Sequence, residues 1–238
     1  IEDSDENIAG AGNDLLAKAG TVTVTGTATI QHATTIAGFA QAVAYSISDV
    51  SNNALETTTN AYNEAINITI IDNTTFAKAK AIEDATNTGN VNYSIFDTAA
   101  AISAGVTSDV GVLNEATTIT VSGTATFAQA ATLASIAKSI IYSISDEQAN
   151  IPGSTTAALN EAVDITVTDD VTFAQAKIID DASNSGSNTY NISDTAAALA
   201  AGIVTSVTAV NGAGAVTSTT ATAAQGATLA SISQAIVY

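Results

Sequence analysis

Apolar and polar positions alternate along short stretches of this chain, and alanine-rich segments follow those stretches. Ile119 and Val121 are apolar and enclose the polar Thr120. A period of two with β-branched residues predicts a half-buried β-strand. In residues 173–182 apolar side chains instead recur every three residues, which predicts a short helix with one buried face. The pattern therefore predicts strands that alternate with short helices.

Short similar sequences, which we call strand words, occupy the predicted strands and recur at a fixed spacing, so the chain is a tandem repeat. Tyrosines at one strand position recur about every 48 residues: Tyr45, Tyr93, Tyr142, Tyr190 and Tyr238. A second strand word lies midway between each pair, and it aligns with the first. Each repeat therefore divides into two half-repeats of about 24 residues, a period typical of an α/β solenoid.

We predict an α/β solenoid of about ten strand–helix coils of ~24 residues, stacked into one parallel sheet. Residues 1–238 are predicted to form one continuous solenoid of five repeats, with boundaries at 1–45, 46–93, 94–142, 143–190 and 191–238. An all-β sandwich or a β-solenoid array is the alternative, because Thr and Val favour strands. The repeated tyrosines are predicted to lie in the core with hydrogen-bonded hydroxyls.

An aspartate follows the strand at the same place in most half-repeats. Six of these aspartates are candidate metal ligands: Asp49, Asp72, Asp97, Asp146, Asp169 and Asp194. Carboxylates of neighbouring coils could share Ca²⁺, which binds oxygen ligands. The competing interpretation is that each aspartate caps its own helix, and Asp3 with Glu6 has the spacing of a capping box. Gly26, Gly123 and Thr219 interrupt the series, which favours capping.

Two further patterns give no support for a specific activity. The Thr-x-Thr strand at 21–25 resembles an ice-binding face, but Ile71 and Phe96 break the lattice that such a face needs. His32 is the only histidine, and cysteine is absent. We therefore predict no enzyme activity and no cofactor, with Ca²⁺ as the one candidate ion.

Composition narrows the classes of partner. The 238 residues carry 23 acidic side chains against five lysines, which gives a formal net charge of −18. Nucleic-acid binding depends on clustered Lys and Arg, so a nucleic-acid partner is excluded. A hydrophobic content of 46% indicates a folded core rather than an acidic disordered tail. The sequence has no apolar run of the ~18 residues that a membrane span needs.

The two ends of the sequence are predicted to be assembly surfaces. Ile1 stands at the central strand position of a half-repeat, and Tyr238 stands two positions before the next centre. Solenoids carry polar capping units at their ends, and neither end has that composition. Two interpretations stay open: the sequence is a window of a longer array, or chains stack end to end and pair their exposed strands.

The recurring words also resemble a known class of repeats. Tyr-Ser-Ile-Ser-Asp at 142–146, the word at 119–130 and Asp-Thr-Ala-Ala-Ala-Leu-Ala-Ala at 194–201 are similar to tandem repeats of very large surface and secreted proteins of bacteria, cyanobacteria among them. The resemblance implies an extracellular or cell-surface location and a structural role in a filament, surface layer or adhesin stalk. The implied partners are copies of the chain or flanking repeats. A Ca²⁺-dependent adhesion or ligand-binding module is the alternative.

Overall fold

The computed structural model describes residues 1–237, in which strands and helices alternate along the chain. The strands are β1 Glu2–Asp3, β2 Val22–Val24, β3 Val43–Ala44, β4 Ile47–Asp49, β5 Ile68–Thr74, β6 Val91–Thr98, β7 Ile119–Ala125, β8 Ile140–Asp146, β9 Ile165–Val171, β10 Asn188–Asp194, β11 Val216–Ser218 and β12 Ile236–Val237. The helices are α1 Asp5–Gly10, α2 Asn13–Leu16, α3 Ile30–Ile36, α4 Asn60–Glu64, α5 Phe76–Glu83, α6 Ala99–Ser108, α7 Val110–Glu115, α8 Phe127–Leu133, α9 Thr156–Glu161, α10 Phe173–Asp180, α11 Ala196–Ile203, α12 Val207–Asn211 and α13 Ala223–Leu229. Two 3₁₀ helices, η1 Ser51–Asn53 and η2 Gln148–Gly153, complete the described elements.

The strands form parallel sheets whose order follows the chain. One sheet has the order β1-β2-β3, and the other contains nine strands from β4 to β12. The predicted α/β class is therefore confirmed, whereas the prediction of one sheet is wrong. The division falls where β3 and β4, which belong to one half-repeat, are separated at Tyr45 and Ser46. The abundant helices also contradict the all-β alternative.

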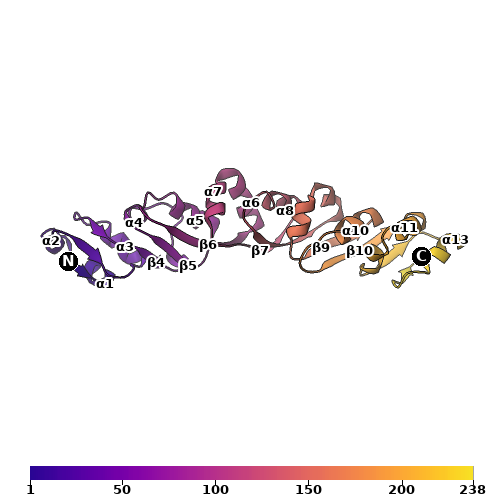
Figure 1. Ribbon diagram of the computed structural model, residues 1–238, viewed down its shortest axis with the longest axis horizontal. Coiled ribbons are helices and arrows are strands. Elements are labelled where there is room, and N and C mark those ends of the chain that lie inside the picture. The colour runs from indigo at the N-terminus through magenta and orange to yellow at the C-terminus, as the bar shows by residue number, and fades with distance from the viewer. Residues whose placement is uncertain (238) are drawn as a thin grey trace. The chain divides into compact units, whose positions relative to one another are not determined.

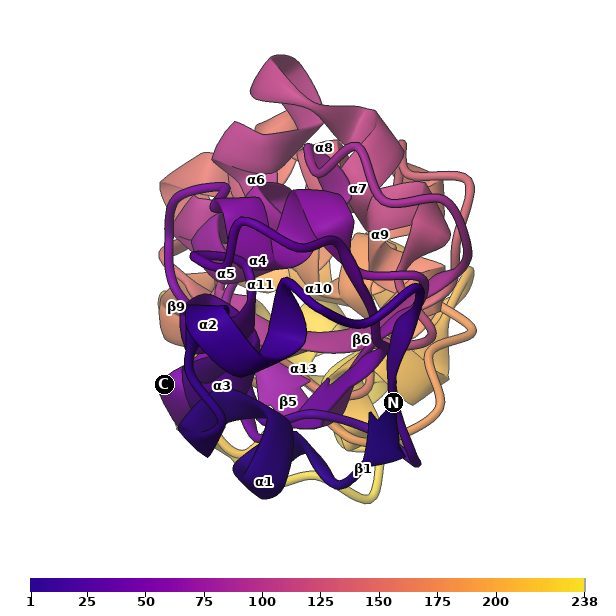
Figure 2. The same cartoon turned by 90° about the vertical axis from the view of Figure 1, so that its left-hand side faces the viewer.

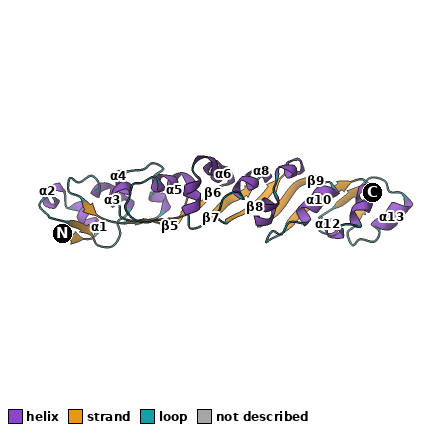
Figure 3. Ribbon diagram, turned by 45° about the horizontal axis from the view of Figure 1, so that its top comes forward, coloured by secondary structure: helices purple, strands orange, loops and turns teal. Residues whose placement is uncertain are grey.

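The chain divides into two compact units, residues 1–97 with 104–120, and residues 98–103 with the chain from 121 onward. In the first unit, α4 and α5 lie along one side of β4 and β5 (Figure 1). In the second unit, α8 and α10 alternate with β8, β9 and β10 (Figure 3). Each unit thus repeats the same strand–helix order.

Two kinds of half-repeat alternate. In one kind a single helix follows the strand, as α5 follows β5 and α10 follows β9. In the other kind two helical pieces follow, such as α6 and α7 after β6, or η2 and α9 after β8. The sequence predicted equivalent coils, and it did not predict this alternation.

The core is formed by the inward strand positions, as the period of two predicts. Ile47, Ile95, Ile144 and Ile192 are each buried to 1% exposure or less. On the helices, Phe173, Ala176 and Ile179 of α10 are buried, which confirms the predicted helical face.

The tyrosines fill the core with hydrogen-bonded hydroxyls, as predicted. Tyr45, Tyr93, Tyr142 and Tyr190 are each at most 2% exposed. Each hydroxyl donates to a backbone carbonyl of a following helix: Tyr45 to Ala61 (2.9 Å), Tyr93 to Val112 (2.8 Å), Tyr142 to Ala158 (2.7 Å) and Tyr190 to Ala209 (2.9 Å). Burial raises the pKa of each phenol, that of Tyr190 to about 12. Tyr238 lies outside the described residues.

The strand register differs from the alignment of the strand words. That alignment equates Ile70 with Ile95, but the structure pairs Ile95 with Thr74 across β5 and β6. The register shifts between Thr69 and Asn73, where the exposed stretch 71–73 departs from the regular pairing. Such an irregularity in one strand re-aims the side chains that follow it, and it places Thr74 in the core.

Thr74 is a flaw in that core position, and its replacement by valine is expected to stabilise the protein. Its side chain is 2% exposed, and its hydroxyl has no hydrogen-bond partner. The matching position in the pairing of β9 with β10 is Val171, which is fully buried. Because Thr74→Val removes an unsatisfied buried hydroxyl, the free energy of unfolding should rise by about 1 kcal/mol in a urea titration. A loss of stability would contradict the described environment.

Candidate functional site

The aspartates at the ends of alternate strands bind the helix of the preceding half-repeat. Asp146 at the end of β8 accepts a hydrogen bond through Oδ2 from the backbone N–H of Phe127, the first residue of α8 (2.9 Å). The same contact recurs in both units: Asp49 with Ile30 (2.8 Å), Asp97 with Phe76 (3.0 Å) and Asp194 with Phe173 (3.0 Å). We call these four contacts the carboxylate links.

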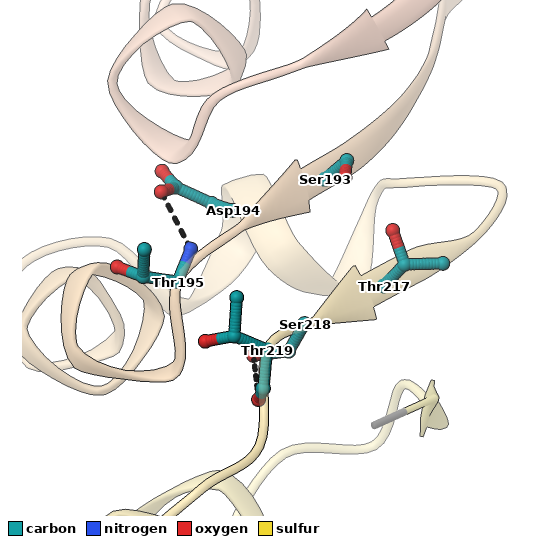
Figure 4. A pocket seen from close by; sticks show the side chains of 6 residues that line it. All are labelled: Ser193, Asp194, Thr195, Thr217, Ser218 and Thr219. Carbon is teal, nitrogen blue, oxygen red and sulfur yellow. Dashed lines mark hydrogen bonds between the residues drawn. The ribbon is translucent and has the colours of Figure 1, made fainter.

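The second carboxylate oxygen binds the turn that follows the aspartate's own strand. Asp146 Oδ1 accepts hydrogen bonds from the backbone N–H of Glu147 (2.9 Å) and from Nδ2 of Asn150 (2.8 Å). Asp194 Oδ1 likewise accepts from the backbone N–H of Thr195 (2.7 Å), and the side chain lies at the end of its strand (Figure 4). Asp49 Oδ1 accepts from Val50 and Asn53 in the same way, so three of the four aspartates join their own turn to the helix before it.

The prediction that each aspartate caps its own helix is wrong. The N-caps of α5, α10 and α11, which follow Asp72, Asp169 and Asp194, are Thr75, Thr172 and Thr195, whose side chains accept from the third residue of their helices. The predicted box of Asp3 with Glu6 is also wrong, because Ser4 caps α1. Threonine can cap because it directly precedes the helix, whereas the aspartate's Oδ2 lies nearer the preceding helix.

Asp72 and Asp169 make a related contact from the other kind of half-repeat. Each accepts a hydrogen bond of 2.6 Å from the first residue of a preceding 3₁₀ helix, Ser51 or Gln148. Thr219 replaces the aspartate after β11, where its hydroxyl accepts from Ala196 (3.2 Å). Gly26 and Gly123 have positive φ, 83° and 78°, so the backbone at these two gaps follows a conformation that favours glycine.

The hydrogen bonds at Asp146 change its acidity. Partial burial opposes ionisation, but the bonds from Asn150, Phe127 and Glu147 stabilise the carboxylate and outweigh it. The pKa of Asp146 is therefore held below its ordinary value. The negative charge also lies at the N-terminus of α8, where the helix dipole favours an anion.

A series of asparagine contacts was missed from the sequence. The side-chain oxygen of Asn63 accepts a hydrogen bond from the backbone N–H of Thr86 in the next half-repeat (3.0 Å). Equivalent bonds join Asn13 to Ala40 (3.0 Å), Asn160 to Ser183 (2.9 Å) and Asn211 to Ser233 (3.2 Å). The recurring word Asn-Glu-Ala at 63–65, 114–116 and 160–162 is the signal that could have revealed them.

The calcium hypothesis finds no cluster of ligands among residues 1–237, where no three His, Cys, Asp or Glu side chains are placed to hold a metal ion. The six predicted ligands Asp49, Asp72, Asp97, Asp146, Asp169 and Asp194 each accept a backbone N–H instead. A surface depression of about 420 Å³ contains Asp194, with Ser193, Thr195, Thr217, Ser218 and Thr219 (Figure 4). Its other side chains are neutral hydroxyls.

We expect calcium to leave the stability unchanged. The N–H groups that face the carboxylate oxygens would repel a cation, and an exposed single carboxylate binds Ca²⁺ weakly. Thermal melting of the protein in EDTA and in millimolar-range CaCl₂ should give the same midpoint. A midpoint that rises with CaCl₂ and falls with EDTA would contradict this expectation and support the calcium-dependent module.

His32, the threonines at 21–25 and the lysine Lys80 have structural contacts. His32 Nδ1 lies 2.7 Å from Asp5 Oδ2, which also accepts from the backbone N–H of Thr29. Lys80 contacts Asp84 and Asp109, both at 2.9 Å, and these groups join α5 to the start of α7. Thr23, the central threonine of the Thr-x-Thr stretch at 21–25, is half-buried in β2.

No family model matches this chain, and no curated protein or solved structure matches it either. Among the described residues, every helix is too short or too polar to cross a lipid bilayer.

Proposed function

We propose that this chain is a structural repeat segment of an extracellular bacterial assembly, of the filament, surface-layer or adhesin-stalk type, and that it has no catalytic role. Its half-repeats stack as successive coils of an α/β solenoid. Its partners are copies of the chain or flanking repeats. The observation that carries the proposal is the recurrence of the carboxylate link in both units.

The polar side chains that recur support this role because they are used to join half-repeats. A carboxylate link ties a strand end to the preceding helix, and an asparagine ties a helix to the following loop. Together with parallel strand pairing, these bonds give each half-repeat polar contacts with its neighbours. A protein that resists extension needs contacts of this kind at every step, since one weak junction would open first.

The acidic composition fits a surface exposed to the medium. A net charge of −18 keeps separate chains apart from one another through like-charge repulsion. Two surface aspartates are each partly neutralised by a lysine four residues earlier: Lys177 binds Asp181 at 2.6 Å, and Lys80 binds Asp84. Non-specific aggregation of the chains is thus disfavoured, and assembly would proceed through specific contact surfaces.

Immunogold labelling of the source cells tests the proposed function. Antibodies raised against the 238-residue protein should label the surface or the extracellular material of intact cells. Cells opened before labelling serve as the control for internal protein. Label found only after the cells are opened would contradict the proposal.

A further inference from the structure

A half-buried glutamate lies beside a buried tyrosine in the first unit. Glu83 ends α5, and its Oε2 lies 3.3 Å from the hydroxyl of Tyr93 in β6. The same hydroxyl lies 2.8 Å from the carbonyl oxygen of Val112 in α7. Figure 2 shows α5 and α7 on the same side of β6. Three elements of the first unit therefore meet at one hydroxyl group.

The hydroxyl of Tyr93 has one proton and faces two acceptors. A phenol donates one hydrogen bond, whereas a carbonyl oxygen and an ionised carboxylate only accept. The shorter contact, to Val112, is also the kind that the other core tyrosines make with a helix carbonyl. When the proton is donated to Val112, an ionised Glu83 has no donor in this contact. A protonated Glu83, in contrast, can donate its own proton to the oxygen of Tyr93.

The second unit contains the same arrangement with an additional donor. Asp180 ends α10 as Glu83 ends α5. The hydroxyl of Tyr190 donates to the carbonyl of Ala209 at 2.9 Å, and Oδ2 of Asp180 accepts from the hydroxyl of Thr208 at 2.6 Å. Each acceptor in the second unit thus has a donor of its own.

The first unit lacks this additional donor. Gly111 stands where Thr208 stands, because each directly precedes the residue whose carbonyl accepts from the tyrosine. Glycine has no hydroxyl, so α7 offers the carboxyl group of Glu83 no partner of the kind that Thr208 provides. The first unit therefore has two acceptors and one donor at this place.

Burial and neighbouring charges oppose the ionisation of Glu83. Burial contributes most, and the negative charges of Glu115 and Asp109 at the two ends of α7 and of Asp84 beside α5 add to it. A hydrogen bond from Tyr93 acts in the opposite direction but is outweighed. The pKa of Glu83 is therefore raised above its ordinary value.

The two lysines of α5 bind other groups. Lys78 donates to the carbonyl of the first residue of η1 at 2.7 Å. Lys80 contacts Asp84 and Asp109, each at 2.9 Å. Both ammonium groups are thus held by partners other than the glutamate, and they do not replace the missing donor.

We infer that Glu83 and Tyr93 form a proton-dependent joint in the first unit. When Glu83 takes up a proton from the solvent, its O–H donates to the hydroxyl oxygen of Tyr93, whose own proton is donated to the carbonyl of Val112. One chain of hydrogen bonds then joins α5, β6 and α7. When Glu83 is ionised, its carboxylate competes with the carbonyl for one proton, and the joint is weaker. The inference goes beyond the proposed function and does not depend on it.

Mild acid should strengthen the protein through this joint. The native pKa of Glu83 is raised, so its contribution is fully present below the unfolded-state pKa of about 4.3 and is lost as the pH rises through the native pKa. This direction is the opposite of the one for Asp146, whose native pKa is lowered. The two carboxyl groups therefore give the protein opposite responses to acid.

Glu83→Gln tests the effect on stability. Glutamine is neutral and its amide can donate to Tyr93, so it resembles the protonated acid. At pH 7 the unfolding equilibrium constant of Glu83→Gln, from urea titration, should be lower than that of the wild type. The expected ratio is about tenfold for each pH unit by which the native pKa exceeds that of the unfolded chain. This gain should disappear as the pH is lowered to about 4.

Asp180→Asn is the matched control, because it removes the same charge from the second unit. Asp180 already has the donor Thr208, so its neutralisation should bring no comparable gain at pH 7. Equal gains in the two variants would show that only the net charge matters, and would overturn the inference. A Glu83→Gln variant that is less stable than the wild type at pH 7 would overturn it as well.

Carboxyl ¹³C NMR of the folded protein tests the direction of the hydrogen bond. The signal of Glu83, assigned by its absence in Glu83→Gln, should titrate with a midpoint above about 4.3. Tyr93→Phe removes the oxygen that accepts from the protonated acid, so it should lower this midpoint. If Tyr93 instead donates to the carboxylate, the same substitution raises the midpoint. A midpoint that rises or stays unchanged in Tyr93→Phe, or a wild-type midpoint at or below about 4.3, would overturn the inference.

Gly111→Thr provides the same test if Tyr93→Phe fails to fold. It introduces the donor that the second unit has, and an added Cβ at Gly111 would meet the side chain of Asp109 at 3.1 Å. A hydroxyl that donates to the carboxylate favours ionisation. The midpoint of Glu83 should therefore fall in Gly111→Thr, and a midpoint that does not fall would overturn the inference.

Discussion

Replacement of Asp146 by alanine is expected to lower the free energy of unfolding by about 2 kcal/mol. The substitution removes the acceptor of three donors: the backbone N–H groups of Phe127 and Glu147 and the side-chain amide of Asn150. The side chain of Phe127 is fully buried at the start of α8, so the loss affects a core position. Urea titration followed by circular dichroism measures the change.

Asp170→Ala is the matched control for this substitution. Asp170 is exposed in β9, and no hydrogen bond of its side chain is present in the described structure. Removal of one negative charge from a chain of net charge −18 should be neutral or slightly stabilising. Equal effects of the two substitutions would show that the carboxylate link contributes nothing specific.

The stability that Asp146 provides should depend on pH in a defined direction. Its pKa is lowered in the native state, so its contribution is fully present above the unfolded-state pKa of about 4. The contribution is lost as the pH falls through the lower native pKa. The difference in unfolding free energy between wild type and Asp146→Asn should thus be largest near neutral pH and shrink below about pH 4. A difference that grows in acid would contradict the link.

Replacement of Gly202 by alanine is expected to destabilise the protein by about 2 kcal/mol. An added Cβ at Gly202 in α11 would lie 2.5 Å from Cδ1 and 2.6 Å from Cζ of Phe173 in α10. Gly105 in α6 is placed in the same way, 2.6 Å from Cε2 of Phe76. Both glycines let a helix approach the phenylalanine of the preceding half-repeat, and a buried ring has little room to move.

Gly226→Ala provides the control in another helix of the same unit. A Cβ at Gly226 of α13 would meet nothing within 4 Å, so alanine there should stabilise the helix by up to about 1 kcal/mol. Opposite signs at the two glycines would confirm that ring contact, rather than helix propensity, decides the result. The double variant Gly202→Ala with Phe173→Leu should recover part of the lost stability. Stabilisation by Gly202→Ala alone would show that the helices are not packed this closely.

The elements of the fold could be predicted because each depends on local sequence. The period of two at Ile119 and Val121 placed β7, and the apolar residues from Phe173 to Ile179 placed α10. Burial of Tyr142 also followed, because its strand neighbours are inward and apolar. Local propensity and hydrophobic period were sufficient for these features.

The register could not be predicted in the same way. The strand words align Ile70 with Ile95, yet the irregular stretch in β5 brings Thr74 opposite Ile95. A shift of this kind depends on the fit of two strands to one core, and not on either word alone.

The role of the aspartates could not be predicted from the sequence, because it depends on how successive half-repeats pack. Their position after the strand suggested a cap for the next helix, but Thr75 and Thr172 cap the helices that follow Asp72 and Asp169. The sequence did contain a clue, since Thr126 with Gln129 and Thr172 with Gln175 have capping-box spacing, and both boxes form. If threonine is identified as the cap, the aspartate must accept its hydrogen bonds from another segment.

Amide hydrogen exchange at the first residues of the helices tests the carboxylate links most directly. First-turn N–H groups have no partner within their own helix, so they exchange quickly unless another group accepts them. The amides of Ile30, Phe76, Phe127 and Phe173 should be protected, and Asp146→Ala should release the amide of Phe127 while the other three stay protected. Exchange of all four at one fast rate in the wild-type protein would contradict the account.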